Sequence, residues 1–181
     1  MRRLLLRLYF LWRYLVVRLT NPGGLRTTGL VFFEPDVTFK IEKGGRVILE
    51  KGVYVKKGAI FECAGHGRIL VREMASIGHY AWLGSRRWIE IGPKSHVGSY
   101  VVLFDSYHNI EKETSISETG YREDEIIIGQ DVIVGTKATI EAGVHLGDWS
   151  VVGANSVVRE DVAPGTYVAG APARIIKKRN S

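Results

Sequence analysis

The sequence predicts an all-β solenoid with three short strands in each coil, preceded by one amphipathic α-helix and interrupted by one protruding loop. Three observations predict it. Aliphatic residues recur every six positions over most of the chain, small residues recur with the same period, and 21 glycines can supply tight turns. A period of six matches neither a helix nor an alternating strand. The 181 residues are enough for one domain with a sizeable core.

The first element is a basic, amphipathic helix predicted over residues 1–22, ending at Asn21-Pro22-Gly23. Residues 1–26 contain six arginines and no acid, and the other 25 − 6 = 19 basic residues balance the 19 acids, so the net charge of +6 lies in this arm. Arginines occupy one side of the helix and leucines with Trp12 the other. Two interpretations stay open. The helix packs on the protein or on a neighbouring subunit, or residues 1–20 lie on an anionic membrane with the arginines at the headgroups.

Composition disfavours several classes of protein. No apolar run approaches the roughly 20 residues that a membrane span needs. Basic residues are concentrated in the N-terminal arm and the last turn of the chain, so no nucleic-acid partner is expected. The single cysteine, Cys63, excludes an internal disulfide and favours a reducing setting. We expect a cytoplasmic protein, with a peripheral position on the inner face of the cytoplasmic membrane as the alternative in which the helix binds lipid.

The repeat begins at Leu49, has a short insertion before Val71 and two extra residues before Ile91, and fades at Pro164 and Gly170. Its first position is held by Leu49, Val55, Phe61, Val71, Ile77, Leu83, Ile91, Val97, Leu103, Ile128, Val134, Ile140, Leu146, Val152 and Val158. Its fifth position is small or β-branched: Val53, Ala59, Ala75, Ala81, Ser95, Val101, Val132, Ala138, Val144, Ser150 and Ser156. Each hexad supplies a strand and a turn, and three hexads form a triangular coil with these two side chains inside. Residues 25–48 indicate only short strands around 31–33 and 47–49.

One long interruption separates Leu103 from Ile128, which lie 128 − 103 = 25 positions apart instead of six. The predicted division is therefore a helix at 1–22, a β-helix domain at 23–176 with a protruding loop at 109–127, and a basic tail at 177–181. A loop that leaves a solenoid corner can form the wall of a site or reach a neighbouring subunit.

The last coils resemble those of a known family. Gly153-Ala154-Asn155-Ser156-Val157-Val158, with Asp161-Val162, Pro164 and Gly170-Ala171-Pro172-Ala173-Arg174, is similar to the ending of the hexapeptide-repeat acyltransferases. Those include the galactoside, maltose and serine acetyltransferases and the colanic-acid-type polysaccharide O-acetyltransferases. The resemblance covers roughly residues 36–176. It implies a left-handed parallel β-helix, a homotrimer, and acetyl-CoA as the acyl donor, and it leaves open whether the acyl group is longer.

The resemblance also implies a binding groove between subunits. Its pantetheine-binding residues would be Gly135, Thr136 and Ala154, where backbone amides and small side chains permit close approach. The nucleotide phosphates would meet Arg174, Lys177 and Lys178. The alternative is that these cations only keep the tail soluble. One departure, Glu160 at a position where family members often carry lysine, bears on the phosphate contacts.

The stretch Asp105-Ser106-Tyr107-His108 is similar to the family's D-x-x-H motif, which implies that His108 is the catalytic base. A histidine titrates near neutral pH, so it can accept the proton of a sugar hydroxyl as the oxygen attacks a thioester. Asp105 either orients the imidazole or shapes the loop, and both interpretations stay open. The acceptor is expected to contact Tyr107, Asn109 and Trp88, the last as part of a second wall with Arg86 and Arg87.

The other histidines are candidates for a role in catalysis or in metal binding. His145 has the same hexad position as His108 and would lie one coil further along the same face, as an assistant in catalysis or an ordinary surface residue. No H-x-x-x-x-H pair occurs, the spacing of the zinc ligands in the γ-class carbonic anhydrases of this fold, so no metal is expected.

The favoured function is acetyl-CoA-dependent O-acetylation of a saccharide hydroxyl, in a polysaccharide or a lipid-linked sugar precursor. The alternatives are N-acetylation of a nucleotide-activated amino sugar, O-acetylation of serine, and a non-catalytic scaffold at the membrane.

Overall fold

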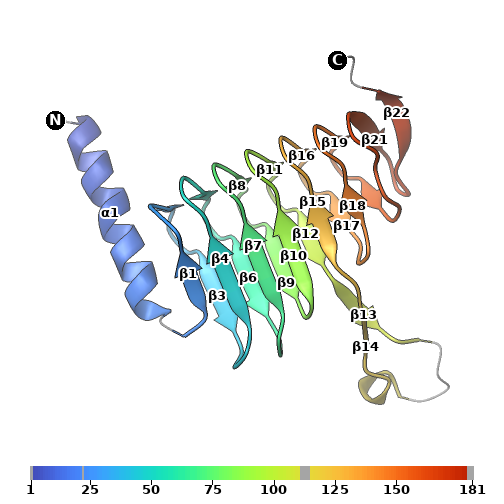
Figure 1. Ribbon diagram of the computed structural model, residues 1–181, viewed down its shortest axis with the longest axis horizontal. Helices are drawn as coiled ribbons and strands as arrows, with labels where there is room; N and C mark the ends of the chain where they lie inside the picture. Colours follow the sequence, from blue (N-terminus) through green and yellow to red (C-terminus); the bar gives the residue numbers. More distant parts are fainter. Residues whose placement is uncertain (1, 22, 111–114, 179–181) are drawn as a thin grey trace.

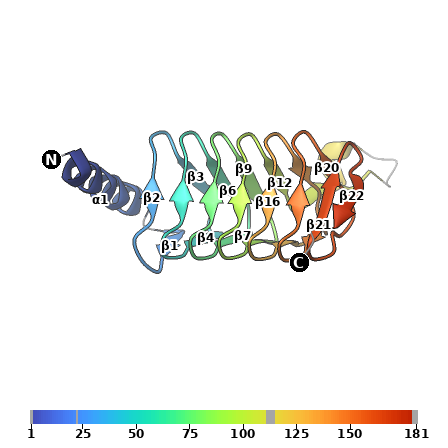
Figure 2. The same cartoon turned by 90° about the horizontal axis from the view of Figure 1, so that it is seen from above.

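The protein is a three-sided solenoid of stacked coils, as a computed structural model shows (Figures 1 and 2). Helix α1 (Arg2–Thr20) stands at one end and a hairpin projects from one side. The structure describes residues 2–21, 23–110 and 115–178. Part of the predicted loop, at 111–114, and the end of the predicted tail, at 179–181, lie outside the described residues.

Each side of the solenoid is one sheet. The strand pairings of the three sheets are parallel, except for the final pairing of sheet two. Sheet one contains β1 (Leu25–Thr27), β4 (Arg46–Leu49), β7 (Arg68–Val71), β10 (Trp88–Ile91), β15 (Ile126–Ile128) and β18 (His145–Leu146). Sheet two contains β2 (Phe32–Phe33), β5 (Tyr54–Val55), β8 (Ser76–Ile77), β11 (His96–Val97), β16 (Ile133–Val134), β19 (Val151–Val152), β21 (Thr166–Ala169) and the antiparallel β22 (Arg174–Lys178). Sheet three contains β3 (Thr38–Ile41), β6 (Ile60–Cys63), β9 (Trp82–Ser85), β12 (Val102–Phe104), β17 (Thr139–Ile140) and β20 (Val157–Val158).

The hexad register is confirmed by the strand pairing. In sheet one, the residues predicted to lead hexads pair in one column, which runs through Leu49, Val71, Ile91, Ile128 and Leu146. The other two sheets hold equivalent columns. All fifteen predicted lead residues and all eleven fifth-position residues named above are buried. The core is therefore a set of aliphatic columns, each strand packing on the equivalent strand of the next coil.

The corners permit close stacking because some positions lack a side chain. A Cβ on Gly78 would overlap the backbone of Gly98 in the next coil. The turns also use residues that the glycine pattern did not predict. Tyr80 and Tyr100 adopt left-handed backbone conformations, with φ of 54° and 58°, and their rings stack with centroids 5.3 Å apart.

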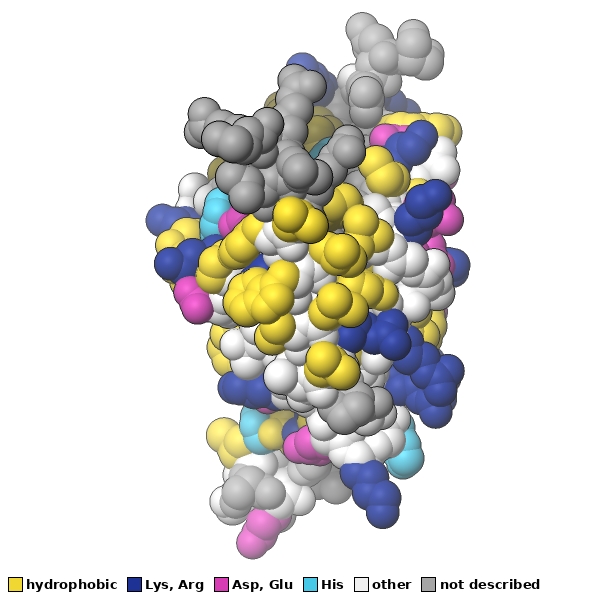
Figure 3. Space-filling model, turned by 90° about the vertical axis from the view of Figure 1, so that its left-hand side faces the viewer, with side chains coloured by type: hydrophobic (Ala, Val, Ile, Leu, Met, Phe, Trp, Pro, Cys, Tyr) yellow, Lys and Arg dark blue, Asp and Glu magenta, His cyan; other side chains and the backbone are white. Residues whose placement is uncertain are grey.

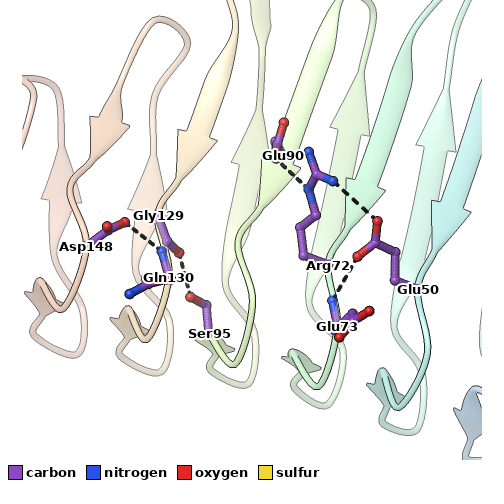
Figure 4. Close-up of polar contacts among 8 residues, drawn as sticks. All are labelled: Glu50, Arg72, Glu73, Glu90, Ser95, Gly129, Gln130 and Asp148. Atoms are coloured by element: carbon purple, nitrogen blue, oxygen red, sulfur yellow. Dashed lines mark hydrogen bonds and ion pairs between the residues drawn. The ribbon is translucent and has the colours of Figure 1, made fainter.

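Polar contacts connect successive coils (Figure 4). The Arg72 guanidinium donates from Nε to Glu90, at 2.9 Å, and from Nη1 to Glu50, at 3.3 Å, and so joins three strands of sheet one. Buried Ser95 donates its hydroxyl to the Gly129 carbonyl at 2.7 Å. That bond spans the long interruption, so the chain rejoins the solenoid in register after it.

The interruption folds into a two-stranded hairpin. Strand β13 (Ser106–His108) pairs antiparallel with β14 (Tyr121–Glu123), and the short 3₁₀ helix η1 (Ile116–Glu118) lies between them. The departure from the solenoid therefore begins at Ser106, three residues before the predicted loop, and Ile126 and Ile127 already belong to β15. At the other end, β22 includes Lys177 and Lys178, which the sequence division assigned to the tail.

Candidate active site

Asp105 is buried at the corner where β12 gives way to the hairpin. Its Oδ1 accepts a hydrogen bond from Arg86 N at 2.7 Å, and its Oδ2 accepts from Ser85 Oγ at 2.6 Å and Arg87 N at 2.9 Å. These three partners of the carboxylate all lie in the turn of the preceding coil. Of the two interpretations of Asp105, the contacts support the one in which it shapes the loop, because they hold the turn and not the imidazole.

His108 lies on the hairpin with its side chain exposed. It pairs with Tyr121 across the two strands, and the two rings are tilted with centroids 4.4 Å apart. The Arg86 guanidinium lies over the same Tyr121 ring at 3.5 Å, a cation–π contact. The turn that Asp105 holds is thereby connected through Arg86 and Tyr121 to the imidazole.

Two hollows flank the base of the hairpin on the outer face of sheet three. The smaller, about 230 Å³, faces the earlier coils and is lined by Glu62, Trp82, Phe104, Arg86, Ser106 and Tyr121, among others. The larger, about 600 Å³, faces the later coils and is lined by Phe104, Ser106, Tyr107, Thr139, Glu141 and Arg159, among others. Phe104 and Ser106 belong to both, so the two hollows meet beside the strand that carries His108.

Sequence reasoning named Arg86 of the smaller hollow but missed its aromatic residues. Trp82 and Phe104 contact edge to face with centroids 4.9 Å apart, and Trp82 donates from Nε1 to Glu62 at 3.3 Å. One residue, Gly84, could have indicated this ring pair. A Cβ on Gly84 would overlap the Phe104 ring, so glycine there makes room for an aromatic ring on the outer face. Tyr121 had no such signal, because its position depends on the hairpin.

The predicted pantetheine residues lie at a different corner from His108. Gly135 and Thr136 precede β17, and Ala154 precedes β20, so all three lie where the strands of sheet three begin. A Cβ on Gly135 would overlap the Ala154 backbone, which places these two residues in direct contact between coils. His108 follows the end of β12. A single chain therefore presents the two groups at opposite ends of sheet three.

The predicted phosphate-binding cations lie on β22, at the C-terminal end of the solenoid. Arg174 lines a hollow of about 360 Å³ together with Arg159 and Glu160. Lys177 lies 6.0 Å from the Tyr167 ring, and both lysines are exposed. Glu160 thus places a carboxylate in the hollow that Arg174 lines.

The predicted acceptor residues are divided between hairpin and solenoid. Tyr107 is exposed and lines the larger hollow, while the Asn109 backbone N–H donates to Gly120 O at 3.1 Å and closes the hairpin. Trp88 begins β10 in sheet one, half-buried and paired in register with Arg68. In the proposed second wall, it is Arg86 that makes the contact with the hairpin.

His145 does not continue the position of His108, because the hairpin takes His108 out of the coil. Its partner in register is Ile127, and its Nε2 lies 3.7 Å from Glu125 Oε1. Cys63 is fully buried, and burial raises the pKa of its thiol to about 12, so it stays protonated and is not a nucleophile. Among the residues that the structure describes, no cluster of three His, Cys, Asp or Glu side chains could hold a metal ion.

Fold and site together define a hexapeptide-repeat β-helix with a histidine-bearing hairpin, and three comparisons agree with this class. The family model for the bacterial transferase hexapeptide (six repeats) matches residues 125–160. The putative lipopolysaccharide biosynthesis O-acetyltransferase of Escherichia coli (strain K12) is 32% identical over 131 residues, which cover 68% of this chain and 67% of that protein. The galactoside O-acetyltransferase of the same strain is 30% identical over 137 residues, which cover 61% and 68%.

A solved structure of similar fold is AntD, an N-acyltransferase from Bacillus cereus in complex with dTDP and 3-hydroxybutyryl-CoA. It superimposes with a TM-score of 0.76 at 18% identity, over 91% of this chain and 88% of that one. The chain belongs to the hexapeptide-repeat transferase family and is an acyltransferase. The predicted fold class, a left-handed parallel β-helix, is confirmed.

Proposed function

We propose that the protein transfers an acetyl group from acetyl-CoA to a hydroxyl of a saccharide, with His108 as the general base. The observation that carries this proposal is the exposed His108 imidazole on a hairpin whose base separates two hollows. The two relatives named above are both O-acetyltransferases, and one is named for galactosides.

In the proposed reaction, the imidazole takes the hydroxyl proton as the sugar oxygen bonds to the thioester carbonyl carbon. The tetrahedral intermediate then collapses, the C–S bond breaks, and the imidazolium gives its proton to the departing thiolate. The products are the acetyl ester and CoA with a free thiol. No covalent intermediate on the enzyme is required, which agrees with the buried, protonated Cys63 thiol.

The two hollows suit different partners. The larger, at about 600 Å³, has the size of a typical small-molecule site, and we assign it to the pantetheine and thioester. The smaller has aromatic faces at Trp82 and Tyr121 and a carboxylate at Glu62, groups that can contact a sugar ring and its hydroxyls. We assign it to the acceptor, and this assignment puts Tyr107, expected from the sequence to contact the acceptor, on the acyl-donor side.

We further propose that the functional unit is a homotrimer. The support is geometric: Gly135, Thr136 and Ala154 lie at the corner of sheet three opposite to His108, so a neighbouring copy could bring the two corners together. Sedimentation equilibrium should then give three chains per particle. A fully active monomer would reject this part of the proposal.

The acceptor assignment is tested by CoA release. Purified protein is incubated with acetyl-CoA and one acceptor at a time, and the free thiol is measured. Release is expected with saccharides that bear only hydroxyls. Release confined to a nucleotide-activated amino sugar or to serine would overturn the saccharide O-acetyltransferase assignment, and absence of both release and acetyl-CoA binding would favour the non-catalytic scaffold.

Removing the aromatic wall of the smaller hollow should affect the acceptor alone. We expect Trp82→Ala to raise KM for the saccharide by roughly tenfold while KM for acetyl-CoA stays close to the wild-type value, because the indole lines only the smaller hollow. Ile133→Ala removes another exposed side chain, from sheet two, and serves as the control. An increase in KM for acetyl-CoA instead would reverse the assignment of the two hollows.

A further inference from the structure

Helix α1 is attached to the solenoid by one side. Val17 is buried on that side, and the Phe10 ring contacts those of Phe32 and Tyr54 with centroids 5.6 and 6.0 Å away. The Tyr14 hydroxyl lies 2.9 Å from Thr27 Oγ1. Aromatic packing and a hydrogen bond thus hold the helix against the first coil.

Two arginines join this attachment. Arg13 donates from Nη2 to the Glu34 carbonyl at 3.0 Å, and Arg18 donates from Nη1 to Thr27 Oγ1 at 2.6 Å. The sequence left two interpretations open, a helix packed on the protein and a helix with its arginine side at lipid headgroups. Among described side chains this orientation is wrong for Arg13, because that side packs on the first coil.

The opposite side of α1 is exposed within the described residues. It carries five apolar side chains, each between 46% and 78% exposed: Leu8, Leu11, Trp12, Leu15 and Leu19. At about 100° per residue these five fall within about 100° of arc, so they form one stripe along the helix. Figure 3 looks at this end of the molecule and shows hydrophobic side chains gathered in the middle of its face. We call these five residues the outer stripe.

Charge decides which occupant fits the outer stripe. Residues 1–26 contain six arginines and no acid. A second copy docked stripe to stripe would bring two arms side by side, each with a net charge of +6 and no acid to neutralise it. An anionic lipid surface offers an apolar layer for the leucines, and its negative charge attracts the positively charged arm as a whole, although Arg13 and Arg18 bond to the first coil. Trp12 in the stripe and Tyr9 beside it are residue types enriched at membrane interfaces.

We propose that the outer stripe docks α1 flat on an anionic lipid surface, so that the end of the solenoid faces the bilayer. Within the described residues no helix is long and apolar enough to cross a membrane. An amphipathic helix with its apolar side in the boundary layer is the arrangement that remains consistent with these observations. The proposal does not depend on the acetyl-transfer function.

The test is co-sedimentation of the full chain with vesicles of phosphatidylcholine and phosphatidylglycerol. The double variant Leu11→Glu/Leu15→Glu should bind roughly tenfold less than wild type or weaker. The charge-matched control, Met74→Glu/Trp149→Glu, changes two comparably exposed apolar residues at solenoid corners and should bind like wild type. Wild-type binding should also fall with phosphatidylcholine alone and in high salt.

Equal recovery of wild type and Leu11→Glu/Leu15→Glu with the vesicles would overturn the proposal. So would a wild type that ignores vesicles but loses a higher oligomer when the stripe is charged, which would identify a second copy as the occupant. Acetylation of a soluble acceptor should be unchanged in the stripe variant. That readout separates failure of lipid docking from failure of the proposed reaction.

Discussion

Replacing His108 with alanine should lower kcat/KM for acetyl transfer by about 10²-fold or more, because general-base assistance of that size is lost. The side chain is exposed and contacts the tilted ring of Tyr121, so the fold should survive its removal. The measurement is acceptor-dependent CoA release, with the denaturation midpoint as a check on folding.

His145→Ala is the matched control. His145 is also exposed and lies at the base of the hairpin, beside Glu125. It should leave kcat close to wild type if it is an ordinary surface residue, and a moderate loss would give it the assisting role. A folded His108→Ala protein with wild-type kcat/KM would eliminate the general base proposed here.

Asp105→Ala should lower the free energy of unfolding by about 3 kcal/mol or more. The reason is that one buried carboxylate accepts three hydrogen bonds, two of them from backbone N–H groups that would lose their acceptor. Because that turn carries Arg86 to Tyr121, acetyl transfer should also decline. Urea unfolding of both proteins measures the difference.

A second carboxylate provides the comparison. Asp148 accepts one hydrogen bond, from Gln130 N at 2.9 Å, and is only half-buried (Figure 4). Asp148→Ala should therefore lower the free energy of unfolding by only about 1 kcal/mol. If both substitutions lower the free energy of unfolding equally, the three hydrogen bonds of Asp105 do not stabilise the protein as we propose.

Most of the solenoid could be predicted from the sequence because only two side chains per hexad point into the narrow triangle. The first coil was indicated only weakly by the sequence. Phe33 and Phe39 pair with Tyr-Val and Ile-Phe strands of the next coil and continue the columns of Val55 and Phe61. Four extra residues separate Phe39 from Leu49, beyond the usual six, and hid that continuity (49 − 39 = 10).

The candidate site could be predicted only in part. The D-x-x-H motif identified His108 and Asp105, but the partners of Asp105 lie in the preceding coil, and only the stacking of coils brings them together. Tyr121 is 13 positions from His108 along the chain and reaches it through the β13–β14 pairing. The predicted loop had no alternating pattern that would have indicated those two strands.

Because α1 lies at one end of the solenoid, the number of coils sets the distance of a residue from any surface that α1 binds. With the outer stripe on a bilayer, each coil adds about 4.8 Å of height, and the strand before the hairpin lies three coils above the first. The His108 imidazole would then lie about 15 Å from the plane of the first coil. Such an enzyme would select, among anchored glycans, the sugar unit held at that height, and acceptors with longer and shorter spacers between lipid and sugar would reveal that selection as a change in rate.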